Sequence, residues 1–265
     1  MLRLRPLAFA AAVLAAAPAT PLPAALAAQG FGQGPPPKNL QVLPKDMSRQ
    51  EVVAKMRLIA AGLGVRCEYC HVSTTGPDGR EQNDFASDDK ENKKIARGML
   101  KMVIDINEKY LKELKPDLAA LHQVSCETCH HGLARPRTVQ MEMIDAVNAK
   151  GADSAIALYK DLRTRYYGRS SYDFGELPLT LAAQQIALTD PEKRPAALAL
   201  LKLNLELNPQ SVPTLTTMAQ MSLAGGDTAA ARDALKKATA LAPDDPQVKR
   251  MLSRLTDTTR KSPPR

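Results

Sequence analysis

The chain has 265 residues with a formal net charge of +8; 44% of the residues are hydrophobic and 24% are charged. This composition is typical of a globular protein with one or two domains. The basic residues form no dense cluster, so a nucleic-acid partner is not expected. Aromatic residues make up only 4% of the chain and tryptophan is absent, so we expect an aliphatic core that a bound apolar group could enlarge.

The first 28 residues have the pattern of a secretory signal peptide. Arg3 and Arg5 precede an apolar run over 7–17, and a small-x-small cleavage site follows at 25–27. Prolines at positions 18, 21 and 23 interrupt the run before the about 20 apolar residues that a membrane span needs. We therefore predict a signal peptide over 1–28 and a mature, periplasmic protein without a transmembrane segment.

A linker is predicted over 29–44, where Gly and Pro are frequent at the start. A helix is expected to begin near Ser48, because Ser48 and Glu51 form a capping-box pattern. Apolar residues then recur at positions 52, 56, 59 and 63, which places them on one helical face. Gly62 and Gly64 are expected to end this helix just before the first cysteine.

The next segment, 72–94, is polar and rich in turn residues, so we predict a surface loop. A second helix should follow, with apolar residues at positions 95, 99, 102, 106 and 110. It should fade near Pro116, and a short helical piece over 117–122 should lead to the second cysteine pair. No segment of the mature chain alternates as a strand does, so the predicted fold class is all-α.

From about Thr138 the chain is dominated by Ala and Leu and carries an internal repeat. A shift of 34 residues superposes Ala197 on Ala231 and Leu201 on Leu235. This period resembles the tetratricopeptide repeat, although the aromatic positions of that motif are poorly filled. We predict helix pairs over 139–258 and a disordered tail over 259–265. Stacked helix pairs could bind a protein partner or simply enlarge the core, and the sequence leaves both possibilities open.

All four cysteines belong to two copies of one motif, C-x-x-C-H, which is the attachment motif of c-type haem. Two thiols at this spacing can reach the two vinyl groups of one porphyrin, and the adjacent histidine can bind the iron. We therefore predict two covalently bound haem c groups per chain. The predicted attachment residues are Cys67, Cys70, Cys126 and Cys129, and the predicted proximal iron ligands are His71 and His130.

Other uses of paired cysteines fit the pattern less well. Four cysteines in an exported chain suggest two disulfides at first. A thioredoxin-like dithiol would need a βαβ context. A zinc site would need the two pairs to converge, and it would not need a histidine after both of them.

The sixth iron ligand is expected from the helix that precedes each motif. Met56 lies 15 residues before His71, and Met102 lies 28 residues before His130. A methionine on an apolar helical stripe is most often a core residue, but a helix just upstream of a haem must pack against it. Met99 and His122 are alternatives for the second iron.

Three stretches resemble the cytochrome subunit of photosynthetic reaction centres and its non-photosynthetic relatives. They are NLQVLPKDMSRQEVVAKMRLIAAGLGVRCEYCHV, DFASDDKENKKIARGMLKMVIDINEKYL and VSCETCHHG, and the resemblance covers roughly 38–135. In that family each haem lies parallel to a preceding helix, which supplies a methionine ligand. By position, the resemblance implies that Met56 and Met102 are the distal ligands.

The family's reaction-centre subunit carries four haems, whereas this chain has two motifs, so the resemblance implies half of that pattern, a dihaem domain over 45–138. The C-terminal repeats are not part of the resemblance, and photosynthesis is not implied. We expect an electron carrier rather than a catalyst. Its expected partners are redox proteins, a membrane-bound electron-transfer complex among them. The alternatives are a dihaem peroxidase-like enzyme with one open iron and a repeat-based docking scaffold that delivers electrons to a partner.

Overall fold

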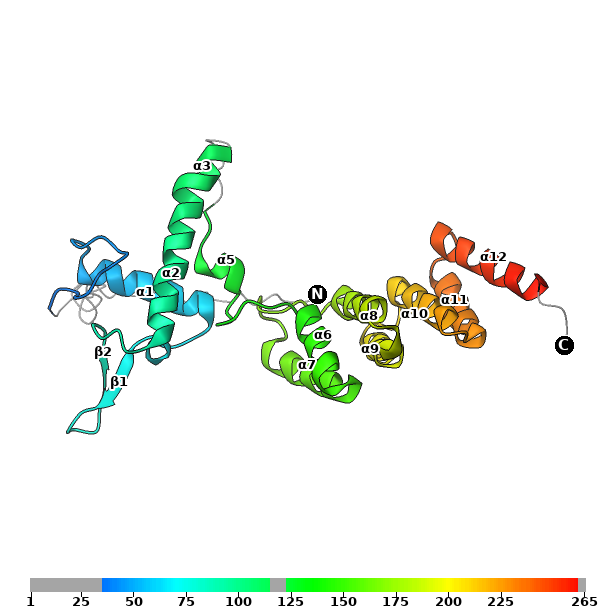
Figure 1. Cartoon of the computed structure of the whole chain (residues 1–265), viewed down its shortest axis with the longest axis horizontal. Helices are drawn as coiled ribbons and strands as arrows, with labels where there is room; N and C mark the ends of the chain where they lie inside the picture. The colour runs from blue at the N-terminus through cyan, green and yellow to red at the C-terminus, as the bar shows by residue number, and fades with distance from the viewer. Residues whose placement is uncertain (1–34, 115–122, 262–265) are drawn as a thin grey trace, which may run out of the picture.

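The computed structural model describes residues 35–114 and 123–261, with side chains up to residue 255. The fold is elongated: the elements α1 to α5 lie at one end, and the helices α6 to α12 follow in a row (Figure 1). The predicted all-α class is confirmed, with the addition of one short hairpin. The signal peptide over 1–28 and the helical piece over 117–122 lie outside the described residues.

Helix α1 (Arg49–Leu63) begins where the sequence predicts. The Ser48 hydroxyl accepts from the Glu51 backbone, and the Glu51 carboxylate accepts from the Ser48 backbone N–H, so both bonds of the capping box are made. The helix ends at Gly64, which takes the left-handed conformation (φ 64°) that glycine adopts without strain. Gly62 was expected to end the helix, but it lies inside it and has a different role, described below.

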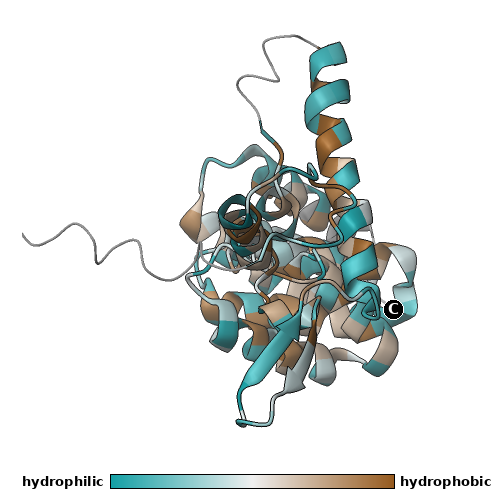
Figure 2. Cartoon of the chain, turned by 90° about the vertical axis from the view of Figure 1, so that its left-hand side faces the viewer, coloured by the Kyte–Doolittle hydropathy of each residue, from teal (hydrophilic) through white to brown (hydrophobic). Residues whose placement is uncertain are grey.

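A β-hairpin replaces part of the surface loop expected over 72–94. The short turn η2 (Cys67–Tyr69) leads to β1 (Val72–Thr75), which pairs antiparallel with β2 (Glu81–Asp84). The hairpin is hydrophilic (Figure 2) and mostly exposed. Because neither face is buried, its strands lack the alternation of apolar and polar residues from which strands are predicted.

Helix α2 (Glu91–Asp105) stands across α1 (Figure 1) and continues through a π-helical turn, η3 (Ile106–Tyr110), into α3 (Leu111–Leu114). After the segment that the structure does not describe, the chain returns to α5 (Cys126–His130), which packs against α1. Both cysteine motifs therefore lie next to α1, one following it in sequence and one docked on it.

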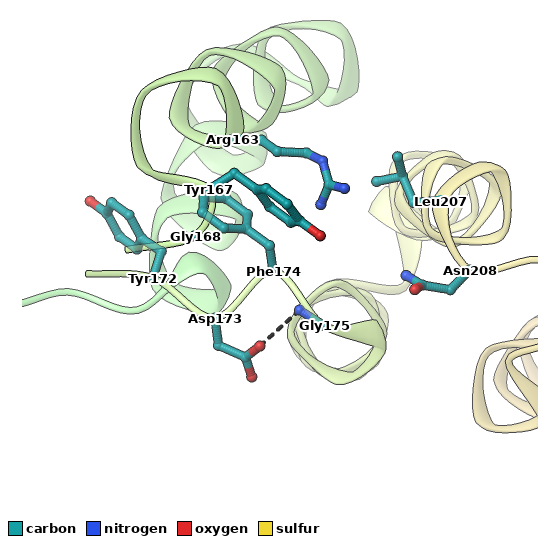
Figure 3. A pocket seen from close by; sticks show the side chains of 9 residues that line it. All are labelled: Arg163, Tyr167, Gly168, Tyr172, Asp173, Phe174, Gly175, Leu207 and Asn208. Carbon is teal, nitrogen blue, oxygen red and sulfur yellow. Dashed lines mark hydrogen bonds between the residues drawn. The ribbon is translucent and has the colours of Figure 1, made fainter. Parts of the chain in front are cut away.

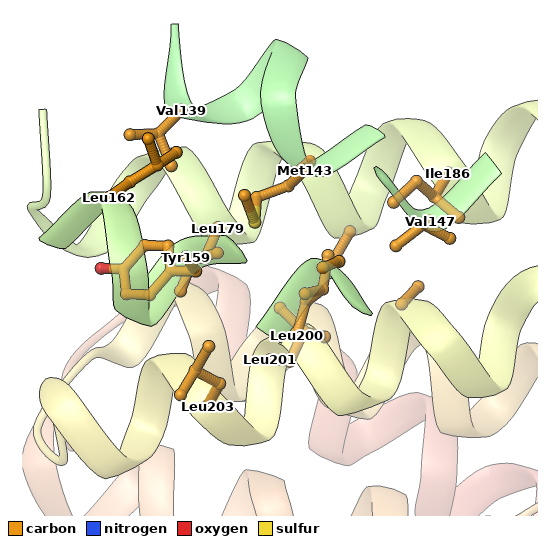
Figure 4. Packing of buried hydrophobic residues seen from close by; sticks show 14 of the residues in the cluster. Val139, Met143, Val147, Tyr159, Leu162, Leu179, Ile186, Leu200, Leu201 and Leu203 are labelled. Carbon is orange, nitrogen blue, oxygen red and sulfur yellow. The ribbon is translucent and has the colours of Figure 1, made fainter. Parts of the chain in front are cut away.

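The remaining helices pack mainly with their sequence neighbours, α6 with α7, α8 with α9, and α10 with α11. Their side chains form two buried clusters, and Figure 4 shows the first around Met143, Tyr159, Leu179 and Leu200. The bounds are α6 (Val139–Lys150), α7 (Ala152–Tyr166), α8 (Glu176–Thr189), η4 (Pro191–Lys193), α9 (Arg194–Leu207), α10 (Val212–Ala224), α11 (Thr228–Leu241) and α12 (Pro246–Lys261).

The 34-residue period has a counterpart in the packing. Ala197 and Ala231 are both fully buried, and so are Leu201 and Leu235. Positions related by the shift therefore occupy equivalent places in consecutive helix pairs. The assignment of these pairs to the tetratricopeptide family stays a prediction. Within the described ranges, none of the helices has the length and apolar character to cross a membrane.

Candidate functional site

One large cavity lies along α1 and collects four of the predicted site residues. Met56, Cys67, Cys70 and His71 all lie on its wall, and its volume is about 700 Å³. Met56 comes from the middle of α1, while the other three belong to the first C-x-x-C-H motif. The structure thus brings together the thiols, the imidazole and the thioether that the sequence assigned to the first haem.

The rest of the wall is mostly apolar. It is formed by one face of α1, the segment before it, and one face of α2; the apolar lining side chains include Leu40, Val42, Leu43, Val52, Val53, Ile59, Ala60, Leu63, Val65, Phe85, Ala96 and Leu100. An apolar cavity of this size with a few polar groups is typical of a cofactor site. The apolar stripe read from the sequence of α1 therefore faces this cavity, whereas Gly62, the one buried position of the helix, is not part of the cavity wall.

The hairpin places the aromatic ring of Phe85 against His71. Val72 pairs with Asp84, so Phe85, the next residue after β2, returns to the residue that precedes β1. The His71 and Phe85 rings meet edge to face, with centroids 5.0 Å apart. The polar hairpin thus helps to hold the imidazole that the motif provides.

The start of α2 forms hydrogen bonds with the backbone of the segment after β2 and with the backbone of the first motif. The Lys93 ammonium is buried and donates to the carbonyls of Phe85, Ala86 and Ser87 at 2.6–3.1 Å. The Lys90 ammonium donates to the Glu68 carbonyl, and the Asn92 amide donates to the Tyr69 carbonyl at 3.2 Å. Five backbone carbonyls on the two sides of the hairpin are therefore fixed by a single helix end.

Asp88 links α2 to the segment before α1, which carries Asn39 and Gln41 and forms part of the cavity wall. Its carboxylate accepts hydrogen bonds from the side chains of Asn39 and Gln41 at 2.9–3.0 Å, and pairs with Arg97 at 2.8 Å and Lys93 at 3.1 Å. The Asn39 amide, followed by the two cations, holds the pKa of Asp88 well below its usual value. This network holds the segment before α1 in place without using any group of the first motif.

The electrostatics of the first motif favour uncharged groups. Burial, followed by the charges of Lys93 and Arg97, lowers the pKa of His71. Burial also raises the pKa of the Cys70 thiol. A neutral imidazole is the form that binds a metal. The Nδ1 atom of His71 is buried and has no hydrogen-bond partner among the described atoms.

The second motif forms the short helix α5, and its histidine is held differently. Ser125 and Thr128 cap the helix start with reciprocal hydrogen bonds. His130 is only 8% exposed, and its Nδ1 lies 2.7 Å from the Leu133 carbonyl oxygen. Because a carbonyl can only accept, Nδ1 carries the proton and Nε2 keeps a lone pair for a metal.

The second motif docks on α1 at a glycine. A Cβ added to Gly62 would lie 2.9 Å from the Glu127 backbone nitrogen and 3.2 Å from the Cys126 Cβ. The Gly62 carbonyl also accepts from the Gly132 backbone N–H at 2.9 Å. Gly62 therefore permits a close approach between the helix that carries Met56 and the second pair of cysteines.

The turn η3, which continues α2, binds the segment that leads into the second motif. The Asn107 amide donates to the Val124 carbonyl and accepts from its backbone N–H. Asn107 lies in η3, which continues α2, and Val124 lies two residues before Cys126. This continuous helix therefore contacts the first motif at its start and, at its far end, the residue that leads into the second motif.

Two of the candidate distal ligands of the second haem lie on the same helix. Met102 lies on α2 and is 43% exposed, while Met99 is half-buried. His122 lies outside the described residues. All four cysteines are free thiols, so the two disulfides that four cysteines suggest at first are not formed in the described structure.

The comparisons with known proteins point to c-type cytochromes. The family model described as photosynthetic reaction centre cytochrome c subunit matches residues 13–222. The chain belongs to the reaction centre cytochrome c subunit family. A cytochrome c-554 of Chloroflexus aurantiacus is 35% identical over 99 residues, which are 37% of this chain and 21% of that protein. The chain thus spans about a fifth of the length of this relative. No solved structure matches the chain.

Membership of this family makes the chain a c-type cytochrome, a class of protein that holds haem c covalently. The residues at the cavity fit the group: it has two free thiols, a buried imidazole nitrogen without a partner, and an apolar wall. The family match continues past residue 135, where the sequence resemblance was expected to end, and includes helices α6 to α9 and most of α10.

A second, smaller cavity in this cytochrome lies among the repeat helices (Figure 3). It has a volume of about 350 Å³ and is lined by polar and aromatic groups, including Arg163, Tyr167 and Asn208. The Arg163 guanidinium lies over the Tyr167 ring, 4.1 Å from its centroid. Asp173 accepts from the Gly175 backbone N–H at 2.7 Å. This smaller cavity has no Cys, His or Met on its wall, in contrast to the cavity along α1.

Sequence reasoning missed several residues that position the haem motifs of this cytochrome. Gly62 was read as a helix end, and no expectation was attached to Lys93 or Asn107. The stretch DFASDDKENKKIAR, which carries part of the family resemblance, contains Asp88, Lys93 and Arg97. Its many charges are the sequence feature from which the network around Asp88 could have been predicted. Nothing in the sequence around Asn107 indicates the role of that residue.

Proposed function

We propose that this cytochrome carries two haem c groups and passes single electrons between redox partners. The observation that carries the proposal is the shared cavity of Met56, Cys67, Cys70 and His71. Bound haem would supply an iron that alternates between Fe(III) and Fe(II), taking up and releasing one electron in each cycle. The protein contributes attachment, axial ligands and an apolar surrounding.

For the first haem, we assign Cys67 and Cys70 to covalent attachment, His71 to the proximal side and Met56 to the distal side. The lowered pKa of His71 favours the neutral form that an iron ligand needs. Met56 is half-buried on α1 and lines the same cavity as the motif. A soft thioether favours Fe(II), so a His/Met pair should give a comparatively high reduction potential.

For the second haem, we assign Cys126 and Cys129 to attachment, His130 to the proximal side and Met102 to the distal side. The face of α2 that carries Ile95, Gly98 and Met102 is largely uncovered by other parts of the described chain. Ile95 is 55% exposed, Met102 is 43% exposed, and a Cβ added to Gly98 would meet nothing within 4 Å. An uncovered apolar stripe is what a haem lying along this helix would bury.

The two sites are joined through α1 and α2, which supports electron exchange between them. Gly62 of α1 lies so close to the second motif that an added Cβ would be 3.2 Å from the Cys126 Cβ. Asn92 of α2 bonds to the first motif, and Asn107 of η3, which continues α2, bonds to Val124 just before the second motif. Rigid attachment of this kind fixes the separation of two redox centres. A two-centre carrier is therefore the function that this geometry supports best.

We further propose export to the periplasm, on the basis of the signal-peptide pattern over 1–28 and the family. The proposed organisation is a linker over 29–44, a dihaem domain over 45–138 and a helical repeat domain over 139–258. The predicted tail begins at 259, so its first three residues belong to α12. A chain that ends at residue 138 tests the role of the repeats: if they only bind a partner, haem attachment persists and partner reduction is lost.

Haem content and ligation test the central proposal. Pyridine haemochrome spectra of the mature chain should give two haems, and one haem after replacement of either cysteine pair by alanine. Met56→Ala and Met102→Ala should each convert one haem to a high-spin or ligand-binding form, whereas Met47→Ala, at the residue just before the Ser48 cap of α1, should not. An intact second haem in Met102→Ala, but an altered one in Met99→Ala, would move the assignment to Met99. A second haem that is high-spin in the unaltered chain would favour a peroxidase-like enzyme with one open iron.

A further inference from the structure

We propose that the Arg49 guanidinium binds a propionate of the haem attached to Cys67 and Cys70. The inference rests on the first haem of the proposed function and adds a specific anion-binding residue to it. Arg49 is the first residue of α1 and lies on the wall of the cavity that also contains the first motif.

The position of Arg49 along the helix points to the propionate edge. The cysteines follow the C-terminal end of α1, and they would hold the vinyl edge of the porphyrin. The propionates project from the porphyrin on the side away from that edge. Arg49 lies about 10 Å before Met56 along the helix axis, at a rise of about 1.5 Å per residue. With Met56 facing the centre of the ring, the N-terminal end of α1 is where the carboxylates would lie.

One buried donor of Arg49 has no partner in the part of the chain that the structure describes. Its Nε is buried and has no hydrogen-bond partner among the described atoms. One terminal nitrogen donates to the Pro35 carbonyl, at a long 3.4 Å. A buried guanidinium nitrogen without a partner is costly, and a carboxylate can accept from two of its N–H groups at once. A haem carboxylate would therefore satisfy an atom that the polypeptide leaves without a partner.

The other cations on the cavity wall are less suited to this role. Lys93 and Arg97 are already bound to the Asp88 carboxylate and to backbone carbonyls. Arg66 pairs with Glu68 at 3.2 Å, and its side chain is 89% exposed. The remaining two, Lys38 and Arg57, are exposed residues. Arg49 alone among the cations lining this described cavity combines a buried donor with the absence of a partner for it.

Binding of Arg49 should affect the reduction potential of one haem. A positive charge near the propionate stabilises Fe(II) relative to Fe(III), because the reduced haem carries one positive charge less. In the full-length holoprotein, Arg49→Leu should therefore lower one midpoint potential in a redox titration and leave the other unchanged. The shifted potential should belong to the haem that Met56→Ala perturbs.

Arg66→Leu is the matched control, because it removes the same charge from the wall of the same cavity at an exposed site. We expect it to shift the potential much less. Resonance Raman spectra give a second readout: the propionate bending band should shift in Arg49→Leu and stay in place in Arg66→Leu. If Arg49→Leu does not assemble, Arg49→Gln serves the same purpose, since it removes the charge and keeps N–H donors.

Haem content distinguishes a failure of the proposed function from a failure of the Arg49 assignment alone. Absence of haem from Cys67 and Cys70 in the unaltered protein would remove the first haem and the proposed function with it. Two attached haems with unchanged potentials and an unchanged propionate band in Arg49→Leu and Arg49→Gln would overturn this inference alone. Equal shifts in Arg49→Leu and Arg66→Leu would also overturn it, because they would indicate a general effect of charge.

Discussion

The side-chain amide of Asn107 forms two hydrogen bonds with the backbone of Val124, each 2.8 Å long, across 17 residues of sequence. Asn107 occupies a π-helical turn, a feature found frequently at functional sites. Val124 lies two residues before Cys126. The contact therefore joins the helix that carries Met102 to the chain that leads into the second C-x-x-C-H motif.

Replacement of Asn107 by Leu should destabilise the protein and disturb the second haem. Two backbone groups of Val124 would lose their partners, which costs about 1–3 kcal/mol for partly buried groups. Denaturant unfolding measures the loss, and the spectrum of the second haem should broaden or become partly high-spin. Asn92→Ala is the control, because it removes one exposed 3.2 Å bond to the first motif. Equal effects of the two variants would contradict a special role for Asn107.

Addition of a methyl group at Gly62 should loosen the contact between α1 and α5. In an ordinary helix, Gly→Ala stabilises by about 1 kcal/mol. Here the added Cβ would lie 2.9 Å from the Glu127 backbone, so the helices must move apart, and overpacking of this kind costs about 1–3 kcal/mol. We expect Gly62→Ala to lower the denaturant midpoint. Ala61→Leu, which adds more bulk at the neighbouring exposed position, should change stability by less than about 0.5 kcal/mol. A more stable Gly62→Ala protein would show that the contact is not tight.

The Asp88 network should make stability depend on pH in the acid range. The pKa of Asp88 is lowered in the folded protein, so its contribution is complete above the unfolded value near 3.8 and is lost as the pH falls through the lower folded value. Asp88→Asn should therefore be less stable than the unaltered protein near neutral pH, and this difference should shrink steadily below about pH 4.

Unfolding measured by circular dichroism over this pH range tests the prediction. Asp78→Asn is the control, because Asp78 forms an exposed pair with Arg80 at 3.7 Å on the hairpin. We expect its effect at neutral pH to be much smaller than that of Asp88→Asn. A stability difference for Asp88→Asn that stays constant down to strongly acid pH would refute the role of the carboxylate charge.

The repeat helices contain a polar contact that should matter for their stability alone. Asn204 is fully buried in α9 and donates to the Glu176 carbonyl at 2.6 Å and to the hydroxyls of Thr180 and Thr214 at 2.8–2.9 Å. Asn204→Ala should cost about 1–3 kcal/mol, because these acceptors lose a buried partner. The melting temperature should fall while haem content and haem spectra stay the same. Gln140→Ala, which removes an exposed 3.1 Å bond to Gln185, should have little effect. Loss of haem in Asn204→Ala would show that the repeats support the cytochrome part directly.

Local patterns determined what could be predicted from the sequence. The capping box at Ser48 and the left-handed cap at Gly64 depend on residues a few positions apart, and the structure has both. The two C-x-x-C-H motifs carry their attachment chemistry within five residues each, so the c-type cytochrome class followed from them directly. The apolar stripe of α1 and the 34-residue spacing of Ala197 and Ala231 are likewise readable along one chain segment.

Only the tertiary structure decided how these pieces meet. Gly62 and Cys126 are 64 residues apart in sequence, and Asn107 binds Val124 through an undistinguished amide. The hairpin that returns Phe85 to His71 buries no face, so it leaves no alternating pattern. Such contacts depend on long-range shape and on hydrogen-bond partners that no local period encodes. The sequence therefore determined which groups could bind a haem, and the packing of α1, α2 and α5 determined where those groups lie.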